Sequence, residues 1–312
     1  MMLPLGAQAD VSIYGRITNG IKYVDPAEPG ADSTTDVHSY GSRFGFKANS
    51  DLGNGMTAIG HFEFQASTDN TGANADGLGN MKTRLGYVGV EGGFGKVTIG
   101  NQGAAFYSNV HFDRSFWNGG HGGYPGSRSS NTIKYSNAVG PLSFQADLRV
   151  DAADDGAYEA NTEDLGKGNG GALGLQAALS DNLTLGFGFD TQDQADMTDG
   201  TETDVFGMSG LATFGQFDVS LAYANKEVSG EEDTQLMQLW ASANLTDQTL
   251  ARVGYGQEDQ DESEATPSTL TAVLIHNLGG GFRVWYEGNA ADDDVADMDT
   301  KVTHEFGLRF DF

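Results

Sequence analysis

The sequence predicts an all-β protein, a sixteen-stranded antiparallel transmembrane β-barrel whose third loop folds into the lumen. Three observations predict this fold. Apolar and polar residues alternate in about sixteen short segments, which is typical of strands with one apolar and one polar face. Short turns alternate with long loops between these segments, as in transmembrane barrels. One connection, 102–128, breaks the alternation and is long and rich in glycine and aromatic residues.

Composition narrows the class of protein. The 312 residues carry a formal net charge of −27 and contain no cysteine. The charge argues against nucleic-acid binding, which needs a basic surface, and the lack of cysteine excludes disulfides and thiolate chemistry. No stretch approaches the ~18 consecutive apolar residues of a transmembrane helix. A barrel crosses a membrane with alternating segments of ~10 residues, so its hydropathy is ordinary.

The N-terminus bears on the compartment. Residues 1–9 end in Ala7-Gln8-Ala9, a small-x-small pattern like a signal-peptidase site. The basic start and longer apolar run of a complete signal are missing. We therefore expect 1–9 to be the remnant of a signal peptide and 10–312 to form a single transmembrane barrel. The alternative is an ordinary unstructured N-terminal tail.

The expected strands follow from the alternation, taken in order. The first, 11–23, places Val11 and Ile13 on one face and Ser12 and Arg16 on the other. A longer polar stretch, 25–41, follows and is expected to be a loop. The further strands are expected at 42–49, 56–66, 83–91, 96–101, 132–137, 142–150, 172–179, 183–190, 204–213, 217–225, 235–244, 249–257, 269–277, 282–289 and 303–312.

The two faces of these segments differ in polarity. Phe306, Leu308 and Phe310 share one face of the last segment, and Glu305 and Arg309 share the other. One face suits lipid and the other suits water. Every strand edge in a membrane must be paired, so the first strand is expected to pair with the last. A soluble β-sandwich also has many short strands, but it would not separate short from long connections so regularly.

The long loops hold most of the acidic residues. These residues concentrate at 151–164, 193–202, 231–233, 258–264 and 292–299. They either hydrate the rim, or form a negative vestibule that enriches cations or binds Ca²⁺ or Mg²⁺ weakly. The EF-hand pattern is absent, so no dedicated metal site and no cofactor is expected.

The connection 102–128 is the candidate functional loop. Connections of this length without secondary structure are usually functional or disordered, and its aromatic content argues against disorder. We expect it to fold inward and narrow a water-filled barrel. Phe116, Trp117 and Tyr124 either pack the loop against the wall or offer a surface on which sugar rings stack. Asp113 is its single acid.

Several motifs resemble Gram-negative general porins. They are Ile13-Tyr14-Gly15-Arg16, the segments 42–47, 83–89, 94–101 and 131–135, and the final Phe312. The resemblance covers the whole mature chain. It implies a homotrimer in the bacterial outer membrane, in contact with lipid and lipopolysaccharide, with both termini in the periplasm. It also implies a third loop whose acids face basic residues of the barrel wall.

The resemblance also implies site residues. The expected pore constriction consists of Arg16, Arg43, Arg84, Lys134, Asp113 and Arg128. By alternation, Arg16, Arg43 and Arg84 fall on the polar faces of their strands. The chain departs from the family pattern because the Pro-Glu-Phe-Gly-type loop motif is absent and the loop has one carboxylate where two are common. The transverse field across the lumen is therefore expected to be weaker.

Four functions compete on these observations. The first is a channel for passive diffusion of small hydrophilic solutes and ions, weakly cation-selective because of the acidic loops. The second is a substrate-specific oligosaccharide channel, suggested by the loop aromatics. The third, an enzyme, is disfavoured because G-x-S-x-G and H-E-x-x-H are both absent. The fourth is a structural barrel with a plugged lumen.

Overall fold

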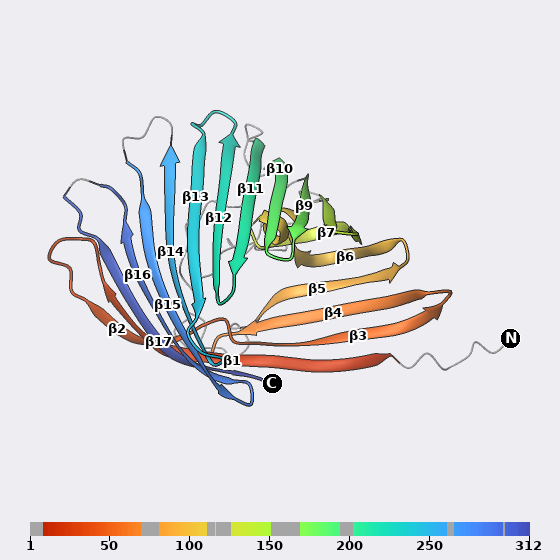
Figure 1. Ribbon diagram of the computed structural model, residues 1–312, viewed down its shortest axis with the longest axis horizontal. Helices are drawn as coiled ribbons and strands as arrows, with labels where there is room; N and C mark the ends of the chain where they lie inside the picture. Colours follow the sequence, from red (N-terminus) through yellow and green to blue (C-terminus); the bar gives the residue numbers. More distant parts are fainter. Residues whose placement is uncertain are drawn as a thin grey trace.

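The computed structural model shows a curved wall of antiparallel strands around a central space (Figure 1). It describes residues 9–69, 81–110, 116, 126–150, 169–193, 202–260, 265–295 and 297–312. The described residues contain seventeen strand segments in one sheet and one short helix. Within them, no helix has both the length and the apolar character needed to cross a bilayer.

The bounds of the helix, α1, are Ala105–Val110. The strand segments are β1 Asp10–Asp25, β2 Thr34–Ser39, β3 Arg43–Gly53, β4 Met56–Ala66, β5 Met81–Gly92, β6 Gly95–Gly103, β7 Arg128–Val139, β8 Leu142–Arg149, β9 Gly170–Ser180, β10 Leu183–Asp193, β11 Glu202–Phe214, β12 Phe217–Val228, β13 Thr234–Asn244, β14 Thr249–Gln260, β15 Ser268–Gly279, β16 Phe282–Asp292 and β17 Lys301–Asp311.

The sheet closes on itself, as predicted. From β3 to β17 each segment pairs with the next one in sequence, and β1 pairs with both β2 and β3 on one side. On its other side β1 pairs with β17, from Arg16 opposite Asp311 to Asp25 opposite Val302. The last residue also takes part, because Phe312 and Gly15 exchange two backbone hydrogen bonds of 2.8 and 3.0 Å. A closed sheet leaves no unpaired strand edge in contact with lipid.

Segments β2 and β3 are two parts of one wall strand. The first half of β1 pairs with β3, and its second half pairs with β2. The register shifts by one residue between the two, around residues 40–42, which is the signature of a β-bulge. Counting the two segments as one strand, the seventeen segments make a sixteen-stranded barrel, the number predicted.

One expectation about this strand was wrong. The polar stretch 25–41 was expected to be a loop, but it contains β2. Val37 is the only apolar side chain of β2, so the segment has no apolar face that alternation could reveal. Its strand conformation comes from backbone pairing with β1, and such hydrogen bonds do not require an apolar face near the rim.

The two faces of the wall carry the polarity that the sequence predicts. Large apolar side chains lie exposed on the outer face, with Ile13 78% and Val88 63% accessible. On β17, Phe306 and Leu308 are exposed, whereas Glu305, the residue before Phe306, is fully buried on the inner face. A β-sandwich would bury its leucines and phenylalanines against a second sheet. The exposed apolar face therefore supports the barrel.

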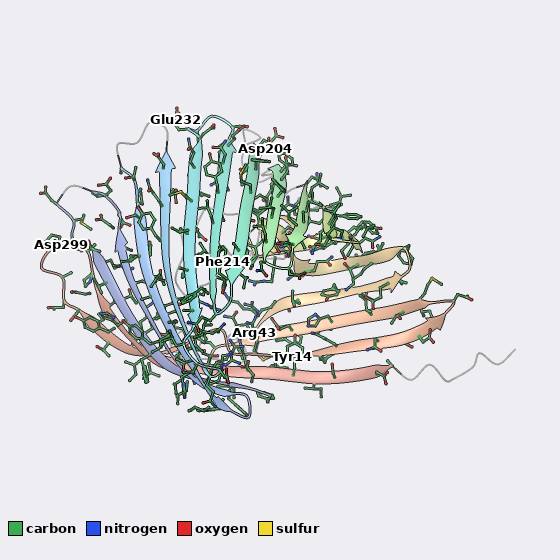
Figure 2. All side chains as sticks on the ribbon, in the orientation of Figure 1. Tyr14, Arg43, Asp204, Phe214, Glu232 and Asp299 are labelled. Atoms are coloured by element: carbon green, nitrogen blue, oxygen red, sulfur yellow. The ribbon has the colours of Figure 1, made fainter. Side chains whose placement is uncertain are left out.

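The two rims differ in their connections. Tight turns join β3 to β4, β5 to β6 and β7 to β8, and β1 begins and β17 ends at this rim. Gly53, Asn54 and Gly55 have positive φ values of 78°, 54° and 75°, which a turn of this tightness needs. The opposite rim carries the longer connections, and Figure 2 shows Asp204 and Glu232 at the end of their strands opposite to Phe214.

Helix α1 packs against the inner face of the wall. Phe106 and Val110 are fully buried and form a cluster with inward-facing residues of β9, β11, β12 and β13. Glycines make room for them, because a Cβ atom at Gly188 would lie 2.6 Å from Val110 Cγ2, and one at Gly207 would lie 2.6 Å from Phe106 Cζ. The connection 102–128, expected to lack secondary structure, therefore begins with a helical turn.

The same connection meets the wall a second time. The ring of Phe116 stacks on Trp285 of β16 with centroids 4.6 Å apart. It joins a second buried cluster, formed by Tyr40, Trp240, Val273, Ile275 and Trp285. In the shorter direction around the sheet, five strands separate β6 from β16. Residues 105–110 and 116 thus contact distant parts of the inner face, while Asp113, Trp117 and Tyr124 lie outside the described residues.

The fit between α1 and the wall predicts the effect of filling one glycine. We expect Gly207→Val to lower the free energy of unfolding by about 1–3 kcal/mol, because the new methyl groups would overlap Phe106 and Val110. Gly210→Val on the same strand is the matched control, since a Cβ there meets only Leu185 at 3.5 Å, and we expect it to change stability by less than about 0.5 kcal/mol.

Urea unfolding in detergent, followed by tryptophan fluorescence, would measure both variants. If both variants lost the same amount of unfolding free energy, α1 would not be in close contact with Gly207.

Candidate functional site

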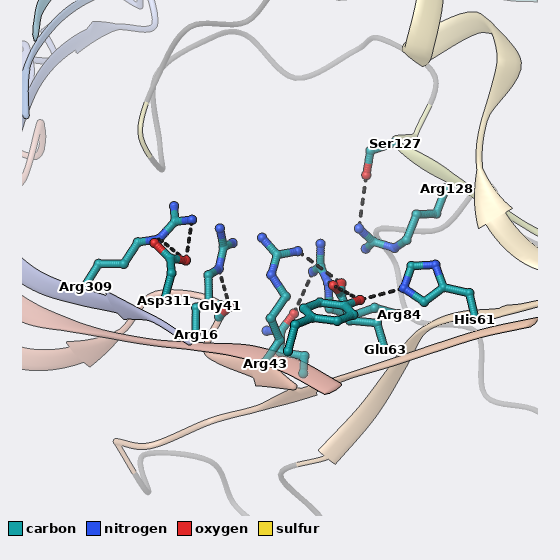
Figure 3. Close-up of polar contacts among 12 residues, drawn as sticks. Arg16, Gly41, Arg43, His61, Glu63, Arg84, Ser127, Arg128, Arg309 and Asp311 are labelled. Carbon is teal, nitrogen blue, oxygen red and sulfur yellow. Dashed lines mark hydrogen bonds and ion pairs between the residues drawn. The ribbon is translucent and has the colours of Figure 1, made fainter. Parts of the chain in front are cut away.

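A row of arginines lies along the inner wall. Figure 3 shows the side chains of Arg309, Arg16, Arg43, Arg84 and Arg128 on the same side of the wall, one after another. They come from β17, β1, β3, β5 and β7. The register supports this order, because Arg16 pairs directly with Arg43, and β1 pairs with β17 on its other side.

Glu63 of β4 binds two of these arginines. Its Oε1 atom lies 3.2 Å from Arg43 Nη1 and 2.9 Å from Arg84 Nε. Its other oxygen, Oε2, accepts a hydrogen bond of 2.9 Å from the Tyr14 hydroxyl. The three charged side chains are 9–19% exposed, so water screens these ion pairs less than it screens pairs on an open surface. Arg84 also donates to Gln65 Oε1 at 2.9 Å.

Arg84 reaches the inner face through a β-bulge. Val88 on the same strand faces outward and is 63% exposed, so strict alternation would place Arg84 outward too. The pairing of β4 with β5 shifts here, from Glu63 opposite Leu85 to Phe64 opposite Thr83, and Arg84 is left without a direct partner. The expectation that alternation alone turns Arg84 inward was therefore wrong, because the extra residue of the bulge reverses its side.

Arg16 has a different environment from Arg43 and Arg84. Its Nε atom donates to the carbonyl oxygen of Gly41 at 3.3 Å. Within the part of the chain that the structure describes, no carboxylate forms an ion pair with it. Gly41 belongs to the interruption between β2 and β3 and has a φ of 59°. The break in the wall strand thus supplies the carbonyl group that orients Arg16.

Arg309 belongs to the row but was missing from the predicted set. Asp311 holds it, with Arg309 Nη2 2.7 Å from Oδ1, and Arg283 Nη2 lies 2.8 Å from Oδ2 of the same carboxylate. The guanidinium of Arg309 also lies 5.9 Å from the ring centroid of Phe116, within cation–π range. The sequence contained the signal that could have identified it. Arg309 lies between the lipid-facing Leu308 and Phe310, so alternation turns it inward, and its strand was expected to pair with the strand that carries Arg16.

The remaining predicted cations lie at the two ends of the 102–128 connection. Lys134 is 9% exposed, and its Nζ donates to the carbonyl oxygen of Gly103 at 2.6 Å. Arg128 donates from Nη1 to Ser127 Oγ at 3.2 Å. The structure therefore places Lys134 beneath the start of the connection and Arg128 at its end. Asp113, the predicted acid of the constriction, lies outside the described residues.

The predicted stacking residue Phe116 is already engaged. One face of its ring stacks on Trp285, and its backbone N–H donates to Glu287 Oε2. Trp117 and Tyr124, predicted with it, lie outside the described residues. Among the residues that are described, no group of three or more histidines and acids is arranged to hold a metal ion.

The local chemistry is that of a charged wall. Five arginines line this part of the inner face. Among the described residues, Glu63 forms ion pairs with Arg43 and Arg84, and Asp311 forms one with Arg309. Such an excess of positive charge attracts anions and orients dipolar molecules in water beside it.

Curated relatives were found among outer-membrane proteins of Neisseria. The chain is 29% identical to the major outer membrane protein P.IB of Neisseria lactamica over 181 residues, which are 55% of this chain and 49% of the relative. It is 38% identical to the P.IB protein of Neisseria meningitidis serogroup A over 104 residues, which are 31% of this chain and 30% of the relative. The chain therefore spans about half, or less, of the curated relatives it matches.

Solved structures share the fold. The anion-selective porin from Comamonas acidovorans superposes with a TM-score of 0.80 at 18% identity, covering 98% of this chain and 100% of that one. The trimer form of OmpT from Vibrio cholerae gives a TM-score of 0.74 at 17% identity, covering 97% and 99%. A family model described as Gram-negative porin matches residues 1–296. The chain therefore belongs to the Gram-negative porin family.

Proposed function

We propose that the protein is an outer-membrane channel for passive diffusion of small hydrophilic solutes and ions. The observation that carries this proposal is a closed barrel of sixteen strands with an apolar outer face and a charged inner face. Barrels of this size are wide enough to enclose water. The rim with tight turns and both chain ends faces the periplasm, since short turns are periplasmic in such barrels.

The constriction of this channel is the arginine row together with the 102–128 connection. The contacts of α1 and Phe116 with the inner face support a connection that crosses the lumen. The proposed acidic partner of Arg16, Arg43 and Arg84 in this constriction is Asp113. A row of cations opposite a carboxylate produces a transverse field, which orients dipolar solutes as they pass.

We further propose weak cation selectivity. The net charge of −27 resides largely in the long connections of one rim, so the vestibule there concentrates cations. The arginine row opposes this preference at the narrowest part. The two effects differ in range, because the vestibule acts through open water and is screened by salt, whereas the arginines act on ions that pass beside them.

General diffusion is favoured over an oligosaccharide-specific channel. The specific channel requires aromatic faces that are free to stack on sugars. Phe116 has one face against Trp285 and the Arg309 guanidinium near its ring, so it contributes to holding the connection. Weak Ca²⁺ or Mg²⁺ binding remains part of the proposal for the acidic loops, most of whose residues lie outside the described chain.

The proposed assembly is a homotrimer in contact with outer-membrane lipid and lipopolysaccharide. The trimer form of the Vibrio cholerae protein, with the same fold, supports this assembly. The exposed apolar side chains of the outer face support lipid contact, since they would be costly to leave in water.

Liposome swelling tests the channel itself. We expect liposomes that contain the purified protein to swell in small sugars, because an open lumen admits them with water. We also expect maltodextrins at low micromolar concentration to leave the single-channel current unblocked. Absence of swelling would indicate a plugged barrel, and maltodextrin block would indicate a specific channel.

The arginine row is tested by its removal. We expect the triple variant Arg16→Gln, Arg43→Gln, Arg84→Gln to shift the reversal potential in a KCl gradient toward cations, because three positive charges leave the constriction. Lys96→Gln is the control, since Lys96 pairs with Glu91 beside a rim turn and both side chains are 43% exposed. A reversal potential that is unchanged in the triple variant would exclude these arginines from the constriction.

Salt concentration separates the two sources of selectivity. We expect the cation preference to be greatest near 10 mM KCl and to decline toward 1 M, because the Debye length falls from ~30 Å to ~3 Å over that range. Reversal potentials measured with a fixed concentration ratio at several mean concentrations would show the trend. Anion preference at the lowest concentration would refute cation selectivity and leave the channel proposal intact.

A further inference from the structure

A histidine lies between two tyrosines on the inner wall beside the arginine row. His61 of β4 is 8% exposed. Its Nε2 atom is 2.6 Å from the Tyr14 hydroxyl, and its Nδ1 atom is 3.1 Å from the Tyr87 hydroxyl. The Tyr14 hydroxyl is also 2.9 Å from Glu63 Oε2. A continuous chain of hydrogen bonds therefore links Tyr87 through His61 and Tyr14 to Glu63, as Figure 3 shows in part.

A glycine makes this chain possible. Tyr14 belongs to β1 and His61 to β4, so the tyrosine must reach across β3. It does so over Gly45, where a Cβ atom would lie 2.8 Å from the Tyr14 hydroxyl oxygen. Any side chain at position 45 would separate the two rings. Gly45 therefore allows Tyr14 of β1 to reach His61 of β4 across β3.

The hydrogen-bond pattern assigns the proton positions. Tyr14 has one hydroxyl proton, and Glu63, an ionised carboxylate, can only accept it. Tyr14 must then accept from His61 Nε2–H, and neutral His61 accepts at Nδ1 from the Tyr87 hydroxyl. When His61 takes up a proton, both nitrogens donate and Tyr87 becomes the acceptor. The bond from Tyr14 to Glu63 is kept, so the network accommodates either charge state of His61.

Among the described residues, the charged or titratable neighbours of His61 come from β1, β3, β4 and β5. Lys47 on β3 and Tyr87 on β5 are its direct cross-strand partners. Tyr14 approaches from β1, and its ring lies 5.3 Å from Lys47 Nζ. Glu63 lies two residues along β4 and is the carboxylate that pairs with Arg43 and Arg84. Lys47 opposes a positive charge on His61, and Glu63 favours it.

We propose that His61 is a specificity-determining residue of the channel. When His61 gains a proton, it becomes a positive charge that is linked through the Tyr14 hydroxyl to Glu63. Glu63 is the carboxylate that offsets Arg43 and Arg84. The added charge therefore shifts the ion preference of the channel toward anions. This proposal rests on the proposed channel function. Histidine is suited to the role because one proton converts its neutral ring into a cation.

The test is the reversal potential of the reconstituted protein in a KCl gradient between pH 8 and pH 5.5. We expect the ratio of cation to anion permeability to fall about twofold in a single-proton step, the effect of one charge acting across ~10 Å of water. Buried carboxylates of the inner wall share this pH range, so the step assigned to His61 is the part of the wild-type change that His61→Gln removes. His61→Gln keeps a polar side chain and should lose the step while retaining conductance.

Two further variants complete the test. His304→Gln is the matched control, because His304 lies on the outer face beside Tyr286 and should retain the wild-type profile. Glu63→Gln should favour anions already at pH 8 and move the step to lower pH, since the carboxylate that stabilises protonated His61 is gone. This variant keeps the proposal testable should His61→Gln fail to fold.

The outcomes are separable. A wild-type profile in His61→Gln, or a flat wild-type profile in a conducting channel, would overturn the role of His61. A wild-type protein without conductance would instead refute the proposed channel function.

Discussion

The structure depends on one constraint, the pairing of every backbone N–H and C=O group of a wall surrounded by lipid. Lipid offers no hydrogen-bond partner, so a sheet that crosses it must close. The pairing of β1 with β17 achieves this closure, and Phe312 extends it to the last residue of the chain. With closure fixed, side chains alternate between lipid and the enclosed space, and the polarity of each strand follows.

The inner face of the closed wall also binds apolar side chains of the 102–128 connection. Two apolar clusters lie on it, one under α1 and one around Trp285 and Phe116. Both depend on glycines of the wall: Gly188 and Gly207 admit α1, and Gly307 admits the indole of Trp285, where a Cβ would lie 2.7 Å from Cζ2. These clusters hold residues 105–110 and 116 of the connection against different parts of the inner face, which is the geometry that the proposed constriction needs.

The charged part of the inner face combines fixed and adjustable charge. Arginines keep their charge at any physiological pH, and Glu63 and Asp311 offset them in part. In the proposed channel, His61 adds a charge that depends on pH and is linked to the same carboxylate through Tyr14. The ion preference of such a wall depends on a small difference between the positive charge of the arginines and the negative charge of the carboxylates, so one added proton is enough to change it.

The sequence by itself determined the barrel, the number of wall strands and the side on which most residues lie, because alternation is a local property of consecutive residues. Only the tertiary structure decided where the alternation fails. The bulge at Arg84 and the interrupted strand around Gly41 depend on how neighbouring strands pair, which is not visible in either strand alone. The place of Arg309 in the row and the reach of Tyr14 over Gly45 likewise depend on closure, because closure brings together residues that are far apart in the chain.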